Sequence, residues 1–570
     1  MNTFQHSDHL TAQPDTPLAR PGSAMADRLF ASGLKWLLAL LLVIGLALPL
    51  LAMLGKVVNL PNGLPGIWHM LSSERFLWLL GNSIKVSVST VAIVVPCAYV
   101  FAYALQRSWV PGKRLLRSIA LLPLMAPSML SAIALIYLFG NQGLLKSWFA
   151  DGIYGFSGIV LGQVFYNFPM ALMILVSALG LADARLYDAS VSMGASHWKT
   201  FLNVTWPGTR YAVFAASCLV FTQTITNFGI PVVIGGDYQV LAMEAYKAVV
   251  GQQKFAEGAL IGSILLVPAL ISFAVDGWMR RLRGSQVSSQ AAPYLAPANR
   301  VRDSVLLLAA GAIALALLSL VVMAASASLI NFWPYDLSLS LRHYDFEASG
   351  DVGWLAYRNS LTLAGLTAVI GTPVIFTCAY LMEKTRSGGV DKLLRLLCML
   401  PMAVPGLVMG LGYVFFFNHP GNPLNGMYGG IALMVVCCVM RFLTPAQMTA
   451  TTALRQLNEE IEAASLSLKV PLLTTYRRVT LPICLPAVLE VLRYLFVSSM
   501  TSVSALIFLY SPDTVLAAVA VLNLDDAGNV GAAAALSTLI LLTSALVSLL
   551  LHLLSRQLLA RSQHWRRGRS

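Results

Sequence analysis

Two sets of hydroxyl and amide side chains correspond to each other position by position in this sequence, one in the first part of the chain and one in the last. The sets are Gln223, Thr224, Thr226 and Asn227, and then Ser498, Ser499, Thr501 and Ser502. Both lie in otherwise apolar runs, where a polar group costs free energy unless it is hydrogen-bonded. Such groups either bond a neighbouring helix or contact a passing polar solute, for example a hydrated zwitterion. The pattern leaves both roles open. The candidate contacts of a solute pathway are Gln223, Thr226, Asn227, Ser498, Thr501 and Ser502.

Charged side chains inside the apolar runs are few. Glu490 and Arg493 stand at positions i and i+3, so they can neutralise each other on one helix face. Their place near the end of a run favours a structural ion pair over a ligand site. Asp276, the other acidic residue in a run, is also near an end. A carrier driven by a proton gradient usually keeps carboxylates deep in its spans, so this distribution argues against one.

No catalytic or metal-binding constellation stands out in the sequence. It has no G-x-x-x-x-G-K-[ST] phosphate loop, no H-E-x-x-H pair and no nucleophile elbow. The seven cysteines form no C-x-x-C pair and fall in or beside apolar runs, which is typical of small packing residues. We therefore expect a protein that is not an enzyme, has no metal or cofactor of its own and does not hydrolyse ATP itself.

The composition is that of a membrane protein. Hydrophobic residues make up 57% of the 570 residues and charged residues only 11%, whereas a soluble protein carries about 25% charged residues. Uncharged runs of about 20 residues span a bilayer as helices, so we predict an all-α polytopic protein. The twelve predicted spans lie near 34–54, 83–106, 117–140, 155–180, 212–234, 258–279, 304–330, 359–382, 394–417, 428–450, 483–509 and 530–555.

The net charge of +13 reports topology rather than a nucleic-acid partner. With a cytoplasmic N-terminus, 29 Lys and Arg fall in inner segments and span ends, and 8 fall in outer ones. Arg441, within the tenth run, is counted as inner, and Arg493 lies within a span. This bias is the positive-inside rule, so both termini are predicted to be cytoplasmic.

The sequence contains an internal duplication. Asn82-Ser83 returns as Asn359-Ser360, and LPLMAP (122–127) returns as LPMAVP (400–405), at almost the same offset along the chain. Both asparagines are predicted to be helix caps at the outer mouths. The predicted organisation is a disordered cytoplasmic tail (1–33), a first six-helix half (34–280), a cytoplasmic linker (281–303), a second six-helix half (304–556) and a basic cytoplasmic tail (557–570). Halves with an even number of spans share one orientation and place a pathway between them.

A polar loop is also repeated, as DASVSMGASHWKTFLNVTWP (188–207) and AASLSLKVPLLTTYRRVTLP (463–482). Asp188 suits a helix start because an acid is favoured near the positive end of the helix dipole. Gly194 is expected to end or bend that helix, and Pro207 to begin the next span. The second copy has Lys469 where the first has glycine, so its turn is predicted to differ.

The loop resembles the EAA loop of permease subunits of binding-protein-dependent ABC importers. The residues that carry the resemblance are Asp188, Ala189, Ser190, Gly194, Val204 and Pro207, with Trp206 in place of the usual leucine. The matching positions of the weaker second copy are Glu462, Ala463, Ala464, Lys469 and Pro482. The resemblance implies that each loop is a coupling helix that docks on a separate ATPase.

The wider resemblance is to the fused, two-half permeases of the ferric-iron and phosphonate branch, through LPLMAP, LPMAVP and TNFGIPVVIGG (226–236). The segment 233–259 most resembles permeases for 2-aminoethylphosphonate. The resemblance implies a bacterial inner-membrane importer of type I fold, two copies of an ATPase that bind Mg-ATP, and a periplasmic substrate-binding protein. Ferric iron and thiamine remain alternative substrates, and a proton-coupled secondary transporter is a distant alternative.

Overall fold

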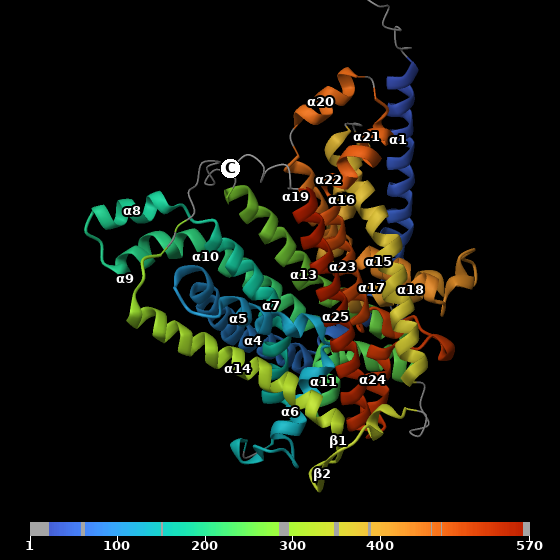
Figure 1. Ribbon diagram of the computed structural model, residues 1–570. Helices are drawn as coiled ribbons and strands as arrows, with labels where there is room; N and C mark the ends of the chain where they lie inside the picture. The colour runs from blue at the N-terminus through green and yellow to red at the C-terminus, as the bar shows by residue number, and fades with distance from the viewer. Residues whose placement is uncertain are drawn as a thin grey trace, which may run out of the picture.

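The structure is a computed structural model that describes residues 22–58, 63–149, 152–283, 294, 296–346, 353–385, 389–457, 459–468 and 470–562. The described residues are mostly helical, and their strands are confined to the antiparallel ribbon of β1 (Ile330–Phe332) and β2 (Asp336–Leu339) (Figure 1). Seven helices are long and apolar enough to cross a membrane, and four bent helix pairs raise the number to as many as eleven. The all-α polytopic class predicted from the sequence is confirmed.

The helices follow the two predicted halves in chain order. The first thirteen are α1 (Gly22–Leu42), α2 (Leu48–Val58), α3 (Gly63–Leu71), α4 (Glu74–Arg107), α5 (Lys113–Leu121), α6 (Met129–Phe139), α7 (Phe156–Gly180), α8 (Ala184–Ser192), α9 (His197–Thr200), α10 (Trp206–Thr226), α11 (Gly229–Ile234), α12 (Leu241–Tyr246) and α13 (Phe255–Arg283). The remaining twelve are α14 (Arg300–Leu329), α15 (Gly353–Lys384), α16 (Gly389–Met399), α17 (Gly406–Phe417), α18 (Ile431–Arg441), α19 (Leu443–Arg455), α20 (Glu459–Ser467), α21 (Leu472–Thr475), α22 (Leu481–Ile483), α23 (Leu485–Met500), α24 (Ala517–Asp526) and α25 (Val530–Ser562).

Several predicted boundaries move. The first helix begins at Gly22 rather than after residue 33, so the predicted disordered tail is too long; residues 1–21 lie outside the described residues. The predicted linker 281–303 is shortened by α13 and α14, and 284–293 and 295 also lie outside the description. Helix α25 runs past the predicted start of the basic tail, of which 563–570 are not described.

The fifth and eleventh predicted spans are each broken rather than continuous. Helix α10 ends at Thr226, the next residue is extended, and the chain resumes as α11 after Gly229. Helix α10 is also too polar to qualify as a span by composition, because it carries threonine, serine and glutamine side chains. The repeated LPLMAP and LPMAVP motifs are breaks too: the helices on either side bend by 106° and 114°, since proline cannot continue the backbone ladder.

The first helix of each half packs against the opposite half. Helices α1 and α2 lie along α16 and α17, while α14 lies along α4, α5 and α6 (Figure 1). Two polar contacts fix α1 and its continuation: Lys35 Nζ lies 2.5 Å from Asp391 Oδ1, and Tyr413 Oη donates to the carbonyl of Gly45 at 2.6 Å. The predicted halves are therefore contiguous in sequence but exchange one helix each in space.

The predicted caps Asn82 and Asn359 are not caps. Both lie inside long helices, α4 and α15, and the cap of α4 is Ser73. Asn82 Nδ2 donates to the carbonyl of Gln239 at 3.1 Å, and Asn359 donates to that of Val515 at 3.0 Å. The next residue in each helix, Ser83 or Ser360, accepts a backbone N–H of the same segment at 2.8 Å. Each Asn-Ser pair thus holds the backbone before α12 or α24.

Candidate functional site

The first repeated loop is a short helix closed by a left-handed turn. Helix α8 begins at Ala184 with Asp183 as its cap, so the prediction that it starts at Asp188 is wrong; Asp188 is an exposed residue within it. Gly194 has φ +72° and ends the helix as predicted, because only glycine adopts this region without strain. The N–H groups of Met193 and Ala195 bond the carbonyls of Ala189 and Ser190 at 3.0 and 3.1 Å.

Two hydroxyl pairs tie this helix to the segment that leads into the next span. Ser190 Oγ lies 2.8 Å from Thr200 Oγ1, and Tyr187 Oη lies 3.0 Å from Thr205 Oγ1. The residues 201–205 form a π-helical turn that leads into α10, with Pro207 in its first turn as predicted. Hydrogen bonds therefore hold α8 to α9 and to the π-helical turn that leads into α10.

The second loop repeats this framework at the offset that separates the two sequence copies. Helices α20 and α21 and the π-helical turn at 476–480 match α8, α9 and 201–205 residue for residue. Ser465 and Thr475 share a hydroxyl hydrogen bond, as Ser190 and Thr200 do. Pro482 lies in the first turn of α22, as Pro207 lies in that of α10.

Part of the second loop is not described in detail. Lys469 lies outside the described residues, and Glu462 and Ala463 lie in α20 without described side chains. The backbone bonds on either side, Leu468 N to the carbonyl of Ala464 and Val470 N to that of Ser465, measure 2.9 and 3.0 Å. They match the equivalent bonds of the first loop, and the turn at Lys469, which the sequence predicts to differ, lies outside the described residues.

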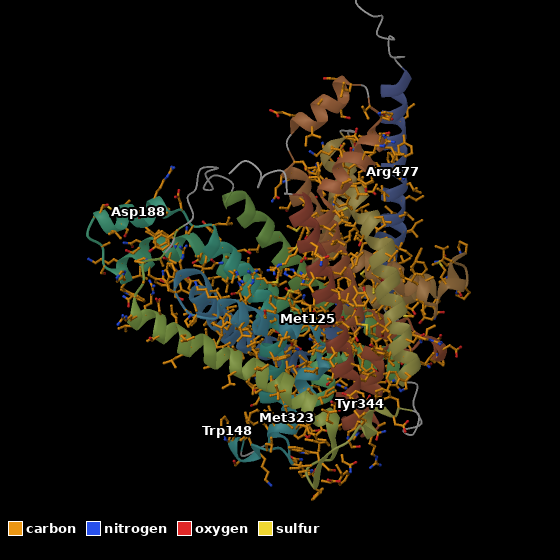
Figure 2. All side chains as sticks on the ribbon, in the orientation of Figure 1. Met125, Trp148, Asp188, Met323, Tyr344 and Arg477 are labelled. Carbon is orange, nitrogen blue, oxygen red and sulfur yellow. The ribbon has the colours of Figure 1, made fainter. Side chains whose placement is uncertain are left out.

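Apolar side chains on both loops face outward. Those of the first loop are Leu186, Val191, Met193 and Trp198, which are 58–80% exposed, and those of the second include Leu468 and Leu473, at 76% and 49%. The two loops lie at one end of the molecule, marked by Asp188 and Arg477, and Trp148 and Tyr344 lie at the other (Figure 2). Exposed apolar side chains on a segment that is held in place by hydrogen bonds are typical of a protein-docking surface.

A buried arginine fastens the first loop to the segment between the halves. Arg107, 3% exposed, donates to the carbonyl of Leu179 at 2.8 Å and lies over the rings of Tyr187 and Tyr294 at 4.9 and 4.7 Å. The two tyrosine rings stack at 3.9 Å. A cavity of about 160 Å³ adjoins them. Tyr294, from the segment between the halves, therefore packs directly against the first loop.

We expect Arg107→Ala to loosen α8 and lower the free energy of unfolding by about 3 kcal/mol, because it removes a charged hydrogen bond and two cation–π contacts. Thermal unfolding and the rate of proteolytic cleavage within residues 184–205 measure the change. Arg210→Ala is the matched control, since Arg210 stacks on Tyr211 at the exposed surface. Equal cleavage rates in both variants would show that Arg107 does not seat the loop.

The six predicted pathway residues form three pairs of equivalent positions. Thr226 and Thr501 donate to carbonyls one turn back, those of Thr222 and Val497, at 2.8 and 3.0 Å. Gln223 and Ser498 are half-buried on their helices. Asn227 and Ser502 contact other helices, and both occupy the same position of the repeat. The two threonines therefore serve their own backbone, and the asparagine and the serine mark the sites where helices meet.

The first half surrounds Asn227 with amides that sequence reasoning missed. Asn227 Nδ2 lies 3.5 Å from Gln163 Oε1, and Asn167 Nδ2 donates to the same oxygen at 3.2 Å and to Thr224 Oγ1 at 3.3 Å. Gln163 is fully buried, and its Nε2 has no hydrogen-bond partner among the described residues. The signal in the sequence was a glutamine and an asparagine one helical turn apart in an apolar run.

The second half presents an arginine instead. Arg441 Nη1 donates to Ser502 Oγ at 3.3 Å, at the bend between α18 and α19. Arg441, which the charge count places with the inner segments, is half-buried, and its guanidinium lies against Gly406 and Ser502. The pair Glu490 and Arg493 does form, with Arg493 Nε 3.1 Å from Glu490 Oε2, and both side chains are partly exposed. That exposure fits the predicted structural pair.

The cysteines and the acidic residues form no metal site among the described residues. The seven cysteines carry free thiols. No group of three His, Cys, Asp or Glu side chains in the described part of the chain is arranged to hold a metal ion. Two acids, Asp525 and Asp526, end α24 beyond the spans. Burial, and then the charge of Asp526, raise the pKa of Asp525 to about 6.

This pKa predicts a pH-dependent contribution to stability. The folded-state pKa of Asp525 is raised above its usual value of 3.8, so the folded protein binds the extra proton. Its contribution is present below about pH 4 and is lost as the pH rises through about 6. We expect Asp525→Asn to raise the free energy of unfolding at pH 7 by at most about 2 kcal/mol and to change nothing at pH 4. Thermal unfolding of both proteins at pH 4 and pH 7 measures this difference. The same difference in stability at both pH values would contradict the prediction.

Comparison with known proteins places these features in a family. Residues 94–331 and 371–559, which are more than half of the chain, match the model described as "Binding-protein-dependent transport system inner membrane component". The ferric transport system permease protein FbpB of Actinobacillus pleuropneumoniae is 29% identical over 448 residues, 74% of this chain. That match spans 63% of the relative, slightly under two thirds of its length.

Two further relatives differ in the solute that their names give. The Fe(3+)-transport system permease protein FbpB 2 of Haemophilus influenzae is 23% identical over 534 residues, which cover 90% of this chain and 97% of that protein. The thiamine transport system permease protein ThiP of Salmonella typhimurium is 24% identical over 403 residues, 67% of this chain and 70% of that protein.

Proposed function

Because the chain belongs to the family of binding-protein-dependent transport system inner membrane components and is a multi-pass inner-membrane protein, we propose that it forms the pathway of an ATP-driven importer. The observation that carries this proposal is the pair of equivalent loops. Each has a helix, a turn and a π-helical connection in the same register, and the two lie at one end of the molecule (Figure 2). A single docking loop would serve a single partner, and two equivalent loops suit two copies of one partner.

The mechanism follows from the stiffness of these loops. Two copies of an ATPase subunit bind Mg-ATP, and each receives one loop through the exposed apolar side chains around Met193 or Leu468. When the ATPases close, the hydroxyl pairs Ser190–Thr200 and Ser465–Thr475 carry the displacement into α10 and α23. The two halves then move as rigid bodies and expose the pathway to one side at a time. A periplasmic binding protein delivers the solute, and the chain itself hydrolyses no ATP.

For the solute we propose 2-aminoethylphosphonate or a related phosphonate, on the resemblance of the segment 233–259. Ferric iron is the second candidate, because two of the relatives above are named as ferric transport permeases. Thiamine is the third, from the name of another. A proton-coupled carrier is disfavoured by the few carboxylates within the spans.

The test is uptake of labelled 2-aminoethylphosphonate by cells that contain this chain with its ATPase and binding protein, against cells that lack only this chain. Ferric iron and thiamine are measured in parallel. Chain-dependent uptake that stops when the ATPase is inactivated supports both the importer and its solute. Uptake that continues without the ATPase and collapses with the proton gradient would overturn the importer.

A further inference from the structure

Arg441 occupies a position that the repeat makes equivalent to Tyr166. Helix α7 runs from Phe156 to Gly180, and α18 with α19 runs from Ile431 to Arg455, so the two segments have the same length and correspond end to end. The register that pairs their ends also pairs the loops that follow them. Arg441 is therefore the second-half counterpart of Tyr166.

The two counterparts lie close enough to interact electrostatically. Two residues that a two-fold relation exchanges can be neighbours only if both lie near its axis. Tyr494 of α23 is within reach of both, so residues of the two halves meet here. The guanidinium of Arg441 therefore lies near the axis between the halves, where a pathway shared by them must run.

The surroundings of Arg441 hold the side chain in place without neutralising it. Its guanidinium packs on the backbone of Gly406, where a Cβ atom would overlap it, and lies 5.3 Å from the centre of the Phe442 ring. Ser502, which accepts the hydrogen bond of Arg441, carries no charge. Within the residues that the structure describes, no carboxylate forms an ion pair with Arg441. A guanidinium without a counter-charge between spans is costly, which favours a functional role.

The opposite half lines the same region with uncharged donors. Asn227, the counterpart of Ser502, belongs to the amide group of Gln163 and Asn167, and Gln163 Nε2 has no partner in the described structure. The guanidinium of Arg441 therefore lies near the phenols of Tyr166 and Tyr494, and the amides of Gln163 and Asn167 lie within one turn of Tyr166 on α7. These side chains can donate hydrogen bonds to anionic oxygens, and none of them is a carboxylate that could bind a metal cation.

We propose that Arg441 is the anion-recognition residue of the pathway, and that the solute passes it as an oxyanion such as a phosphonate group. This inference rests on the proposed importer function and narrows its solute class. Arginine suits the role because its planar donors match phosphonate or carboxylate oxygens. A single charge, with tyrosine at the equivalent position, binds an anion without retaining it, as conduction requires. A free ferric ion is repelled, so iron passes only as an anionic chelate.

The first experiment measures the local charge without a known solute. Ser498 is half-buried one turn from both Tyr494 and Ser502, so Ser498→Cys reports the reactivity of this region in the full chain. The rates at which this cysteine reacts with an anionic and with a cationic methanethiosulfonate are measured in membranes, with and without ATP. The unchanged chain, which has its native cysteines, is the background control.

We expect the anionic reagent to be favoured, and Arg441→Gln to lower the ratio of the two rates by at least about tenfold. Arg493→Gln is the matched control, because Arg493 is paired with Glu490 on the same helix and should leave the ratio unchanged. An unchanged ratio in Arg441→Gln, or a cysteine that neither reagent reaches in any state, would overturn the inference.

The second experiment is uptake of 2-aminoethylphosphonate with ATPase activity stimulated by the binding protein. Arg441→Gln should lower uptake at least about tenfold while the stimulated ATPase activity persists, and Arg441→Lys should retain more uptake. The exchange Tyr166→Arg with Arg441→Tyr moves the charge across the axis and should restore part of the uptake. Full uptake in Arg441→Gln contradicts the inference and leaves the importer standing. If the wild type transports no phosphonate, the proposed solute fails, and the thiol-reagent ratio still decides on the anion site.

Discussion

Gly194→Asp is expected to lower uptake at least about tenfold while the chain still inserts into the membrane. Gly194 has φ +72°, where a residue with a side chain is strained by about 1–2 kcal/mol. A Cβ there would meet no atom within 4 Å, so crowding plays no part. The strained turn instead opens, and the bond from Ala195 N to the carbonyl of Ser190 is lost with it. In the proposed mechanism, α8 then no longer moves with α10.

Two further variants make this prediction specific. Gly194→Asn should retain most of the uptake, because asparagine tolerates the left-handed conformation better than other residues. Lys469→Gly, the reverse change at the equivalent position, should leave uptake unchanged or raise it. The readouts are uptake and stimulated ATPase activity at equal amounts of inserted protein. Full uptake in Gly194→Asp would show that the left-handed turn is not needed for coupling.

Lys35→Met is expected to lower the free energy of unfolding by about 3–5 kcal/mol, since it removes the ammonium group that faces the mostly buried carboxylate of Asp391. Lys35 is fully buried, and its Nζ lies 2.5 Å from Asp391 Oδ1 and 2.8 Å from the carbonyl of Thr385. The contact joins α1 to the start of α16 in the opposite half. Its loss should free α1 before the rest of the protein unfolds.

The double variant Lys35→Met, Asp391→Leu separates charge from packing. Removing both charges should recover much of the stability, because an apolar pair avoids the desolvation cost. Thermal unfolding in detergent and protease cleavage near residue 58 follow the two variants. Arg302→Met removes a more exposed pair, with Asp303, and should cost well under half as much. Equal losses for Lys35→Met and Arg302→Met would show that the buried pair does not fasten α1.

The parts of the structure that sequence reasoning reached are those that are local or repeated. The end of α8 at Gly194 follows from one residue, and the second loop from its likeness to the first. The start of α8 was missed because Asp183 is as good a cap as Asp188, and the choice depends on where the preceding span ends. The count of spans was approached but not matched, since polar and proline-containing segments bend or break.

Long-range contacts were out of reach of the sequence. Asn82 looks like a cap from its neighbours, but its partner lies 157 residues away. Arg441 looks like the end of a span until the bend at Phe442 turns it toward Ser502. The exchange of first helices leaves no trace in composition or periodicity, because an apolar helix reads the same whichever half it covers. These features follow from packing, which only the structure supplies.

The exchange of first helices determines when each half can finish its assembly during biosynthesis. Lys35 and Asp391 are separated by 356 residues, so α1 enters the membrane long before its partner exists. At bacterial translation speeds of roughly 5–20 residues per second, about 20 to 70 seconds pass between the synthesis of Lys35 and the synthesis of Asp391. During that interval lipid, water or the insertion machinery must accommodate a lysine within an apolar helix. Assembly of the N-terminal half therefore cannot finish until most of the chain has left the ribosome.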